Sequence, residues 1–587
     1  MYVMGLNLGH DRSACIVKDG EIVVAVEEER LDRSKHSPGF LVHGYGGRLE
    51  LSEYLTRVLP MKSINYCLEA VGLSIDDLDL VVGNKSIYDN ALKRMLLEFP
   101  IRDKSKLRIL PAPSHHLAHA YSAYFASPFD DAAVLVVDGV GSLTEDGTGF
   151  EKHTIFDAQG RSMERVYSDA FPKDYSEVGI GLFYSFFSSK LSFVTRYGHP
   201  AFGDFGCGGY PEAGKTMGLA PYGQHRPDWP RLLHLDAGKV NARTADLEDA
   251  WRRWLKEDGE GFDSGERGSW DHPFAKDVAR KVQEETEEAL LYLARHARKI
   301  TGRRRLCFTG GVALNSVANE RIANESGFDE VYFFGPSGDD GVAIGSAYYG
   351  YYALAGGEKR HHVKSASMGR AYGQDAIDEA VREAGGAVEA RQAEVSEVAR
   401  LIASHHTVGW FQTGSEIGPR ALGHRSIVAD PRHPEMRDYL NDVVKHRELF
   451  RPFAPSVLAE RVSDWFESDR ESPFMLLVPH VRQDKEKVIP AVCHVDGTAR
   501  VQTVHQETNS AYHALISAFA EITGVPLVLN TSYNDAGEPI VETPADAIRT
   551  FLNTEIDYLY LGDTLLSKPG RSLPDSHPSR RPVEVSK

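Results

Sequence analysis

Short apolar runs separated by polar turns open the chain. Tyr2 to Leu6, Ala14 to Lys18 and Glu21 to Val26 each have the length and composition of a β-strand. Between the last two, the dipeptide Asp19-Gly20 accepts the left-handed backbone conformations of a tight hairpin turn. The pattern therefore predicts a strand, a polar loop and a hairpin at the start of the chain.

Helical and strand patterns alternate farther along. The spacing predicts a helix over 63–71 and strands over 78–82 and 132–137. The longest helical pattern runs from Phe274 to Lys299, with its apolar residues on one stripe, and leads into a strand over 306–308. Alternation of this kind predicts an α/β sheet.

A second segment follows the polar, basic stretch GGEKRHHVKSAS. This stretch has little to bury and predicts a connector over 361–370 between domains at 1–360 and 371–587. In the second domain we predict helices over 393–404 and 545–553 and strands over 407–411 and 525–529. The tail over 569–587, rich in Ser, Pro and charge, is predicted to be loose.

Composition narrows the class of protein. With 587 residues, 42% of them hydrophobic, the chain can form two or three cores. The net charge of −18 argues against general binding to nucleic acid or to an anionic membrane. The five cysteines form no CxxC pair, and neither a signal peptide nor a membrane-spanning run is visible, so we expect a cytoplasmic protein.

Two histidines and two aspartates form a candidate metal site. In HHLAHAYSAYF, His115 and His119 are four residues apart, so a helix would place both imidazoles on one face, with His116 pointing elsewhere. Asp138 ends an apolar strand, and Asp339 lies in a loop after another short strand. These ligands suit Fe, Mn or Zn better than Mg. A hydrogen-bonded histidine pair explains the spacing of the imidazoles equally well.

Glycine-rich loops after three strands favour nucleotide binding, because glycine lets backbone amides approach an anion. They are GLNLGHDRSA, VDGVGSLTEDGTG and TGGVALNSVAN, and the last contains Gly310, Gly311 and Asn315. In EAGKTMGLAPYG, Lys215 stands between glycines, where its ammonium could reach a phosphate. A turn with a solvated lysine is the alternative.

Basic and amide side chains recur in the second domain. Arg420, Arg425, Lys445 and Arg500 could converge on phosphate oxygens, with Ser532 and the Asn530-Thr531 loop supplying further donors. Acidic residues are interspersed among them, so ordinary surface charge remains an equal alternative.

Taken together, these motifs resemble the NodU/CmcH carbamoyltransferase family. The most specific segments are HHLAHAYSAYF followed by VVDGVG, GKTMGLA, GGVALN, GPRALGHRS and RPFAPS. The resemblance implies an N-terminal actin/Hsp70-like duplicated domain and a C-terminal YrdC-like α/β domain. It also implies an ATP-dependent O-carbamoyltransferase, which makes carbamoyl-adenylate from carbamoyl phosphate and ATP and transfers the carbamoyl group to a small-molecule hydroxyl, as in antibiotic biosynthesis.

The resemblance also assigns residues. It implies that iron is bound by His115, His119, Asp138 and Asp339, and that Mg²⁺ accompanies ATP. His10 matches the base for the acceptor hydroxyl, and Lys35 matches an active-site lysine. Carbamoyl phosphate and ATP are expected at Arg420, Lys445, Arg500 and Ser532.

Competing functions share parts of this pattern. A threonylcarbamoyl transferase acting on tRNA is disfavoured by the acidic charge and by the GPRALG and RPFAPS segments. A hydrogenase-maturation carbamoyltransferase should carry paired CxxC motifs, and a non-catalytic nucleotide-dependent scaffold is the third alternative. The identity of the acceptor depends on loops such as 39–60 and 222–271, and a homodimer is left open.

Overall fold

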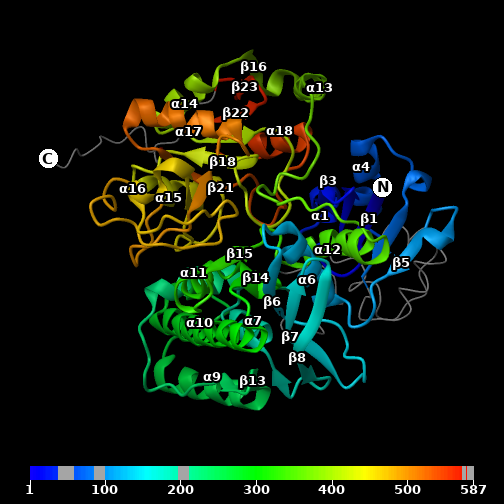
Figure 1. Cartoon of the computed structure of the whole chain (residues 1–587). Helices are drawn as coiled ribbons and strands as arrows, with labels where there is room; N and C mark the ends of the chain where they lie inside the picture. Colours follow the sequence, from blue (N-terminus) through cyan, green and yellow to red (C-terminus); the bar gives the residue numbers. More distant parts are fainter. Residues whose placement is uncertain (38–58, 85–98, 196–209, 267, 571–576, 578–587) are drawn as a thin grey trace. The chain divides into compact units, whose positions relative to one another are not determined.

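The computed structural model describes residues 1–37, 59–84, 99–195, 210–266, 268–570 and 577 (Figure 1). The chain forms two compact units, Met1–Val363 and Lys364–Lys587. Their division falls within the stretch where the sequence places the connector. Most of the expected acceptor loop over 39–60, and most of the tail over 569–587, lie outside the described residues.

The first sheet of unit 1 has five strands in the order β3-β2-β1-β4-β5. β1, β2 and β3 are antiparallel neighbours, whereas β1, β4 and β5 run parallel. Asp19 and Gly20 have φ values of 50° and 90°, which confirms the predicted hairpin turn. The strands are β1 Tyr2–Asn7, β2 Ser13–Lys18, β3 Glu21–Glu27, β4 Leu80–Gly83 and β5 Leu107–Ile109.

The second sheet of unit 1 repeats this topology. Its order is β8-β7-β6-β14-β15, with three antiparallel strands followed by two parallel ones. Two sheets with the same order and the same strand directions confirm the expected duplication. The strands are β6 Asp131–Val137, β7 Gly149–Gln159, β8 Ser162–Pro172, β14 Arg305–Thr309 and β15 Glu330–Phe333.

One helix packs closely against the first sheet and against a neighbouring helix. Helix α12 (Val342–Tyr348) packs on β1 and on α6 (His115–Ala126) through two glycines. A Cβ at Gly5 would lie 2.0 Å from the Ala343 carbonyl oxygen, and a Cβ at Gly345 would lie 1.8 Å from that of Ala118. No larger residue fits at either position. The contact brings the loop before α12 to the first turns of α6.

Further helices and short strands complete unit 1. The long predicted helix is α10 (Pro273–Thr301), which lies beside α7 (Ile180–Lys190) in Figure 1. The further helices are α1 Glu28–Asp32, α4 Met61–Val71, α8 Ala213–Leu219, α9 Thr244–Asp258 and α11 Ser316–Glu325. The short strands are β9 Glu177–Val178, β10 Val194–Thr195, β11 Tyr210–Pro211, β12 His234–Asp236 and β13 Lys239–Arg243.

Unit 2 contains a mixed eight-stranded sheet in the order β16-β23-β22-β17-β18-β21-β19-β20. Its core joins Trp410 and Leu529 of the sheet with Phe519 and Phe551 of the helices. The strands are β16 Glu389–Gln392, β17 Val408–Phe411, β18 Arg425–Ala429, β19 Ala454–Leu458, β20 Gln502–Val504, β21 Leu527–Ser532, β22 Tyr558–Leu561 and β23 Thr564–Ser567. The helices are α13 Gln374–Ala384, α14 Val395–Ala403, α15 Glu435–Tyr439, α16 Val462–Trp465, α17 Ser510–Thr523 and α18 Pro544–Asn553.

One residue corrects the prediction of a loose tail. His577 is fully buried, and its Nε2 lies 2.9 Å from Asp557 Oδ2. A buried imidazole with a carboxylate partner is anchored, so composition alone was misleading at this position.

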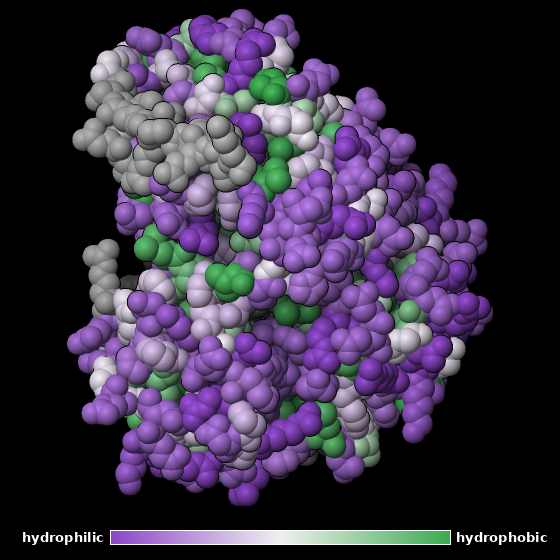
Figure 2. Space-filling model, turned by 90° about the vertical axis from the view of Figure 1, so that its left-hand side faces the viewer, coloured by the Kyte–Doolittle hydropathy of each residue, from purple (hydrophilic) through white to green (hydrophobic). Residues whose placement is uncertain are grey.

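The surface agrees with the polar composition. On the face shown in Figure 2, hydrophobic residues are scattered among polar ones. None of the helices in the described part of the chain has both the length and the apolar content needed to cross a membrane.

Candidate functional site

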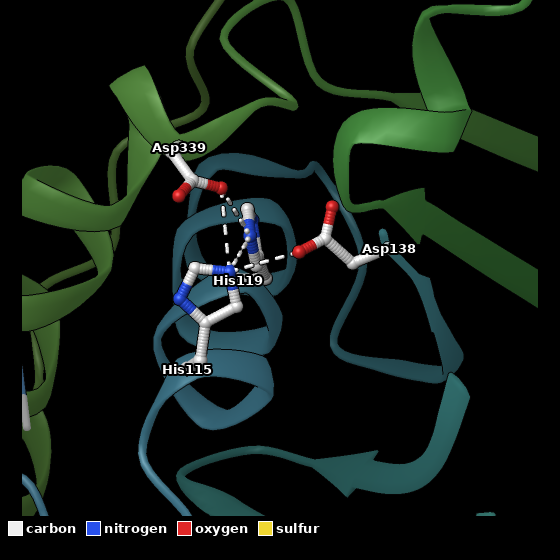
Figure 3. Close-up of side chains that lie close together, drawn as sticks. All are labelled: His115, His119, Asp138 and Asp339. Carbon is white, nitrogen blue, oxygen red and sulfur yellow. Dashed lines mark hydrogen bonds and ion pairs between the residues drawn. The ribbon is translucent and has the colours of Figure 1, made fainter. Parts of the chain in front are cut away.

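Four predicted ligands meet in unit 1, from three different elements (Figure 3). His115 and His119 project from the first two turns of α6. Asp138 follows the carboxyl end of β6, and Asp339 stands just before α12. All four residues are at most 9% exposed. The helical spacing and the two strand-end loops thus produce one buried group.

The distances within this group are short. His115 Nε2 lies 3.0 Å from Asp138 Oδ2 and 3.3 Å from Asp339 Oδ1. His119 Nε2 lies 3.2 Å from His115 Nε2 and 3.5 Å from Asp339 Oδ1. Donor atoms that share an ion with bonds of about 2.1 Å are roughly 3.0–3.4 Å apart. The residues therefore fit a metal ion bound by two imidazoles and two carboxylates.

The charges of this group are strongly coupled. Burial acts to lower the pKa of His115, but Asp339 and Asp138 together hold it well above its ordinary value. Burial acts to raise the pKa of Asp339, and the neighbouring imidazoles His10 and His115 hold it well below its usual range. Burial also acts to raise the pKa of Asp138, but His115 holds it below its usual range, so both carboxylates are anionic at neutral pH, as metal ligation requires.

Two neighbouring residues stay outside the group. The Nδ1 of His116 lies 2.8 Å from Thr154 Oγ1, so this imidazole points away, as predicted. Burial and the charges of the neighbouring histidines hold the pKa of His116 well below its ordinary value. Asp340 does not join the four ligands, and burial together with nearby carboxylates raises its pKa well above the usual range. The geometry thus favours Asp339 as the ligand.

His10 lies beside the candidate metal group. Its Nε2 is 3.2 Å from Asp339 Oδ2, and its Nδ1 is 2.7 Å from Asp11 Oδ2. The other oxygen of Asp11 lies 2.9 Å from His36 Nδ1. Burial acts to lower the pKa of His10, but Asp339 and Asp11 raise it to about 9. Sequence reasoning missed Asp11, which stands in the GLNLGHDRSA segment, and His36, which ends the segment EEERLDRSKH.

The charges of Lys35 and Lys215, which are far apart in sequence, both stabilise the carboxylate of Glu212. Lys215 Nζ lies 2.9 Å from Glu212 Oε2. Burial acts to raise the pKa of Glu212, but Lys215 and Lys35 lower it to about 2. Lys35 also precedes His36, whose backbone carbonyl accepts a hydrogen bond from the Asp11 N–H at 2.8 Å. The structure therefore brings both lysines to the side of unit 1 that carries His10.

The glycine loop after β14 supports the metal group. Gly311 donates its backbone N–H to Asp138 Oδ1 at 3.1 Å. Gly310 has φ of 93°, and a Cβ there would lie 2.2 Å from the Val137 carbonyl oxygen. The Asn315 side chain caps α11 and pairs with Gln283. These groups make contacts within the protein, and their predicted role in nucleotide binding stays a prediction.

Unit 2 gathers four guanidinium groups. Arg500 is close enough to the other three for their charges to act on it. Burial, and after it the charge of Arg451, lowers the pKa of Arg420 to about 10. Burial, and after it the other three arginines, holds the pKa of Arg500 well below its ordinary value. We call Arg420, Arg447, Arg451 and Arg500 the arginine cluster; like charges in a half-buried site favour an anionic ligand.

One buried amide shapes part of the arginine cluster. The fully buried Asn441 accepts from Arg447 Nε at 2.7 Å and donates to the Arg451 carbonyl oxygen at 2.9 Å. Sequence reasoning missed Arg447 and Arg451, although both lie in the segment VVKHRELFRPFAPS. The available signal was a pair of basic residues four positions apart, the second of which is the first residue of RPFAPS.

Lys445, in the same segment as Arg447 and Arg451, lies next to Ser532, as predicted. The buried Lys445 Nζ donates to the Ser532 carbonyl oxygen at 2.6 Å and its Oγ at 3.1 Å, and to Asn534 Oδ1 at 2.7 Å. Asn530 donates its side-chain amide to Ala421, Ser456 and Gln502, and Thr531 pairs with Ile427 in the sheet. Lys445 and Asn530 are therefore held rigidly.

Arg425 corrects one prediction. Its guanidinium stacks on the Phe411 ring at 3.6 Å and donates to the backbone oxygens of Gln412 and Thr413. The side chain is fully buried, so it stabilises the loop after β17 and does not converge with the arginine cluster.

Comparisons with known proteins identify the family of the chain. The family model "Carbamoyltransferase N-terminus" matches residues 2–98 and 81–348, and "Carbamoyltransferase C-terminus" matches residues 399–568. The chain belongs to the carbamoyltransferase family. The metal group falls in the first matched region and the arginine cluster in the second.

Named relatives cover most of the chain. It is similar to the nodulation protein NolNO of Sinorhizobium fredii, with 34% identity over 95% of this chain and 79% of that protein. It is also similar to nodulation protein NolO of Bradyrhizobium diazoefficiens, with 37% identity over 79% of this chain and 80% of that protein. With the 3'-hydroxymethylcephem-O-carbamoyltransferase of Amycolatopsis lactamdurans it shares 29% identity over 96% and 99% of the two chains.

Proposed function

We propose that this carbamoyltransferase activates a carbamoyl group with ATP in unit 2 and transfers it to a hydroxyl of a small molecule in unit 1. The observation that carries the proposal is the arginine cluster in the matched C-terminal region. Four guanidinium groups repel one another, so this site is suited to substrates that carry several negative charges. Carbamoyl phosphate and ATP have that character. We also infer a YrdC-like fold for unit 2, which its mixed eight-stranded sheet supports.

The first half-reaction consumes both substrates. Water cleaves carbamoyl phosphate to carbamate and phosphate, and a carbamate oxygen then attacks the α-phosphorus of ATP. The products are carbamoyl-adenylate and pyrophosphate. The arginine cluster would hold the phosphoryl oxygens, and Lys445 would keep the Ser532 loop in place through its three hydrogen bonds. Mg²⁺ would accompany the ATP phosphates.

The second half-reaction forms the product. The acceptor hydroxyl attacks the carbamoyl carbon, AMP leaves, and the hydroxyl proton goes to a base. His10 is the candidate base, with Asp11 orienting its Nδ1. Lys35 and Lys215 would supply positive charge for the departing AMP phosphate.

The candidate metal ligands in unit 1 are His115, His119, Asp138 and Asp339. A bound cation such as Fe²⁺ would neutralise Asp339 and thereby lower the pKa of His10 from about 9 toward the range in which an imidazole accepts protons. The chain contributes the orientation of the ligands through α6 and through the Gly311 N–H on Asp138.

The test measures the two half-reactions separately. Purified protein is incubated with ATP and carbamoyl phosphate, and phosphate and pyrophosphate are measured without an acceptor. A panel of hydroxylated metabolites is then added, and mass spectrometry looks for the mass gain of one carbamoyl group. Pyrophosphate release that does not depend on carbamoyl phosphate would refute the proposal.

A further inference from the structure

A second histidine and aspartate group lies in unit 2, away from the arginine cluster in the sequence. It consists of His406, Asp557 and His577. Asp557 and Thr407 stand at the starts of the parallel neighbours β22 and β17. Asp557 Oδ2 accepts from the Thr407 backbone N–H at 2.8 Å and from its hydroxyl at 2.9 Å. The carboxylate is therefore fixed by the sheet itself.

Both imidazoles approach this carboxylate. Asp557 Oδ2 lies 2.9 Å from His577 Nε2 and 3.7 Å from His406 Nδ1. The two imidazole rings are 5.4 Å apart. His406 Nδ1 is buried and makes no hydrogen bond to any described residue. His406 Nδ1 faces Asp557 Oδ2 but lies too far from it for a hydrogen bond. A cation therefore has room between the two atoms.

The donor spacing matches a transition metal. The candidate ligand atoms all lie within 4.8 Å of one another, and the distances of 2.9 and 3.7 Å bracket the roughly 3.3 Å expected between donors on a tetrahedral ion. Two imidazoles and one carboxylate suit Zn²⁺ better than Mg²⁺ or Ca²⁺. Aromatic rings limit access of water, since Tyr439 packs on His577 and Tyr558 on His406.

We propose that His406, Asp557 and His577 form a second metal site, which binds Zn²⁺ or a similar divalent transition metal. The site is structural. It joins His577, near the carboxyl end of the chain, to the starts of two central strands. A hydrogen-bonded network without metal is the competing explanation, and it would also hold His577 on Asp557.

The experiment isolates this site in the full-length chain. The parent variant carries His115→Ala and His119→Ala, which remove two ligands of the first group. Co²⁺ is titrated into the metal-free parent and followed by its visible absorption, and Zn²⁺ is then added as a competitor. We expect one Co²⁺ per chain, displaced by Zn²⁺, and an unfolding temperature that rises when Zn²⁺ binds.

Matched substitutions decide between the two explanations. His577→Phe and His406→Phe in the parent keep a ring against the neighbouring tyrosines but remove one donor atom. Each should weaken Co²⁺ binding by at least about 100-fold. His405→Phe is the control, because this adjacent imidazole faces Asp430 at 3.2 Å instead. It should leave the affinity within about twofold.

Either of two results would overturn the proposal. One is a parent that binds no Co²⁺ at concentrations up to 100 times that of the protein, which would leave only the hydrogen-bonded network. The other is an affinity that His406→Phe and His577→Phe leave unchanged, which would place the bound ion elsewhere. Because two substitutions probe the same site, failure of one variant to fold still leaves a decisive measurement.

Discussion

Replacing Arg500 by methionine should stabilise the ligand-free protein and yet impair its activity. Arg500 is half-buried, and the charges of Arg420, Arg447 and Arg451 all oppose its own. Methionine has a similar length and carries no charge. The substitution therefore relieves repulsion in the folded state and removes a contact to the anionic substrate, which gives two effects of opposite sign.

The repulsion between like charges sets the size of the first effect. Burial, and after it the charges of Arg420, Arg447 and Arg451, holds the pKa of Arg500 well below its ordinary value. A pair of charges in contact with solvent interacts by about 0.2–1 kcal/mol, so relief of the three repulsions gives about 1–2 kcal/mol. A lowered pKa on a basic group means that its charge opposes folding at every pH below that value. Arg500→Met should thus raise the free energy of unfolding at pH 7 by about 1–2 kcal/mol.

The second effect follows from the lost phosphate contact. A hydrogen bond to a charged group contributes about 1.5–3 kcal/mol, so pyrophosphate release should fall by roughly 10- to 150-fold. Stability is measured by urea unfolding without ligand, and activity by pyrophosphate release over a range of carbamoyl phosphate and ATP concentrations.

A surface arginine provides the control. Arg461 forms an exposed ion pair with Asp464, so Arg461→Met should change stability by less than about 0.5 kcal/mol and leave the rate intact. A less stable Arg500→Met protein would refute the argument from like charges. A native rate of pyrophosphate release would remove Arg500 from the substrate site.

Three other substitutions test separate parts of the proposal. His10→Asn should lower product formation by roughly two to four orders of magnitude while pyrophosphate release stays within about twofold; equal loss of both would show that the steps are not separable. His119→Ala should lose the metal of unit 1, measured by elemental analysis, while pyrophosphate release persists; retained metal would exclude His119 as a ligand. Lys445→Met removes the hydrogen bonds of a buried ammonium, although Asn534 N–H still donates to the Ser532 carbonyl and Ser532 Oγ to Asn534 Oδ1, and should cost about 1.5–3 kcal/mol in urea unfolding; an unchanged midpoint would contradict this role.

The sequence by itself determined the local elements and the family. The 3.6-residue spacing over Phe274–Lys299 anticipated α10, and Asp19-Gly20 anticipated the β2–β3 turn. The four-residue spacing of His115 and His119 fixed their common helix face. These features depend on neighbours a few residues away, so a short window of sequence contains the information that decides them.

Only the tertiary structure decided which distant residues meet. The repeated strand order of unit 1 brings Asp138 and Asp339 to α6, and no pattern in either segment encodes the other. The same holds for Arg420 and Arg500 in the arginine cluster, which lie in different segments of unit 2. Side-chain packing, which composition does not report, turned Arg425 inward and buried His577 in a segment of polar composition. The physical reason is that long-range contacts are fixed by pairing and packing of whole elements, whereas sequence periodicity reports only which face of one element is apolar.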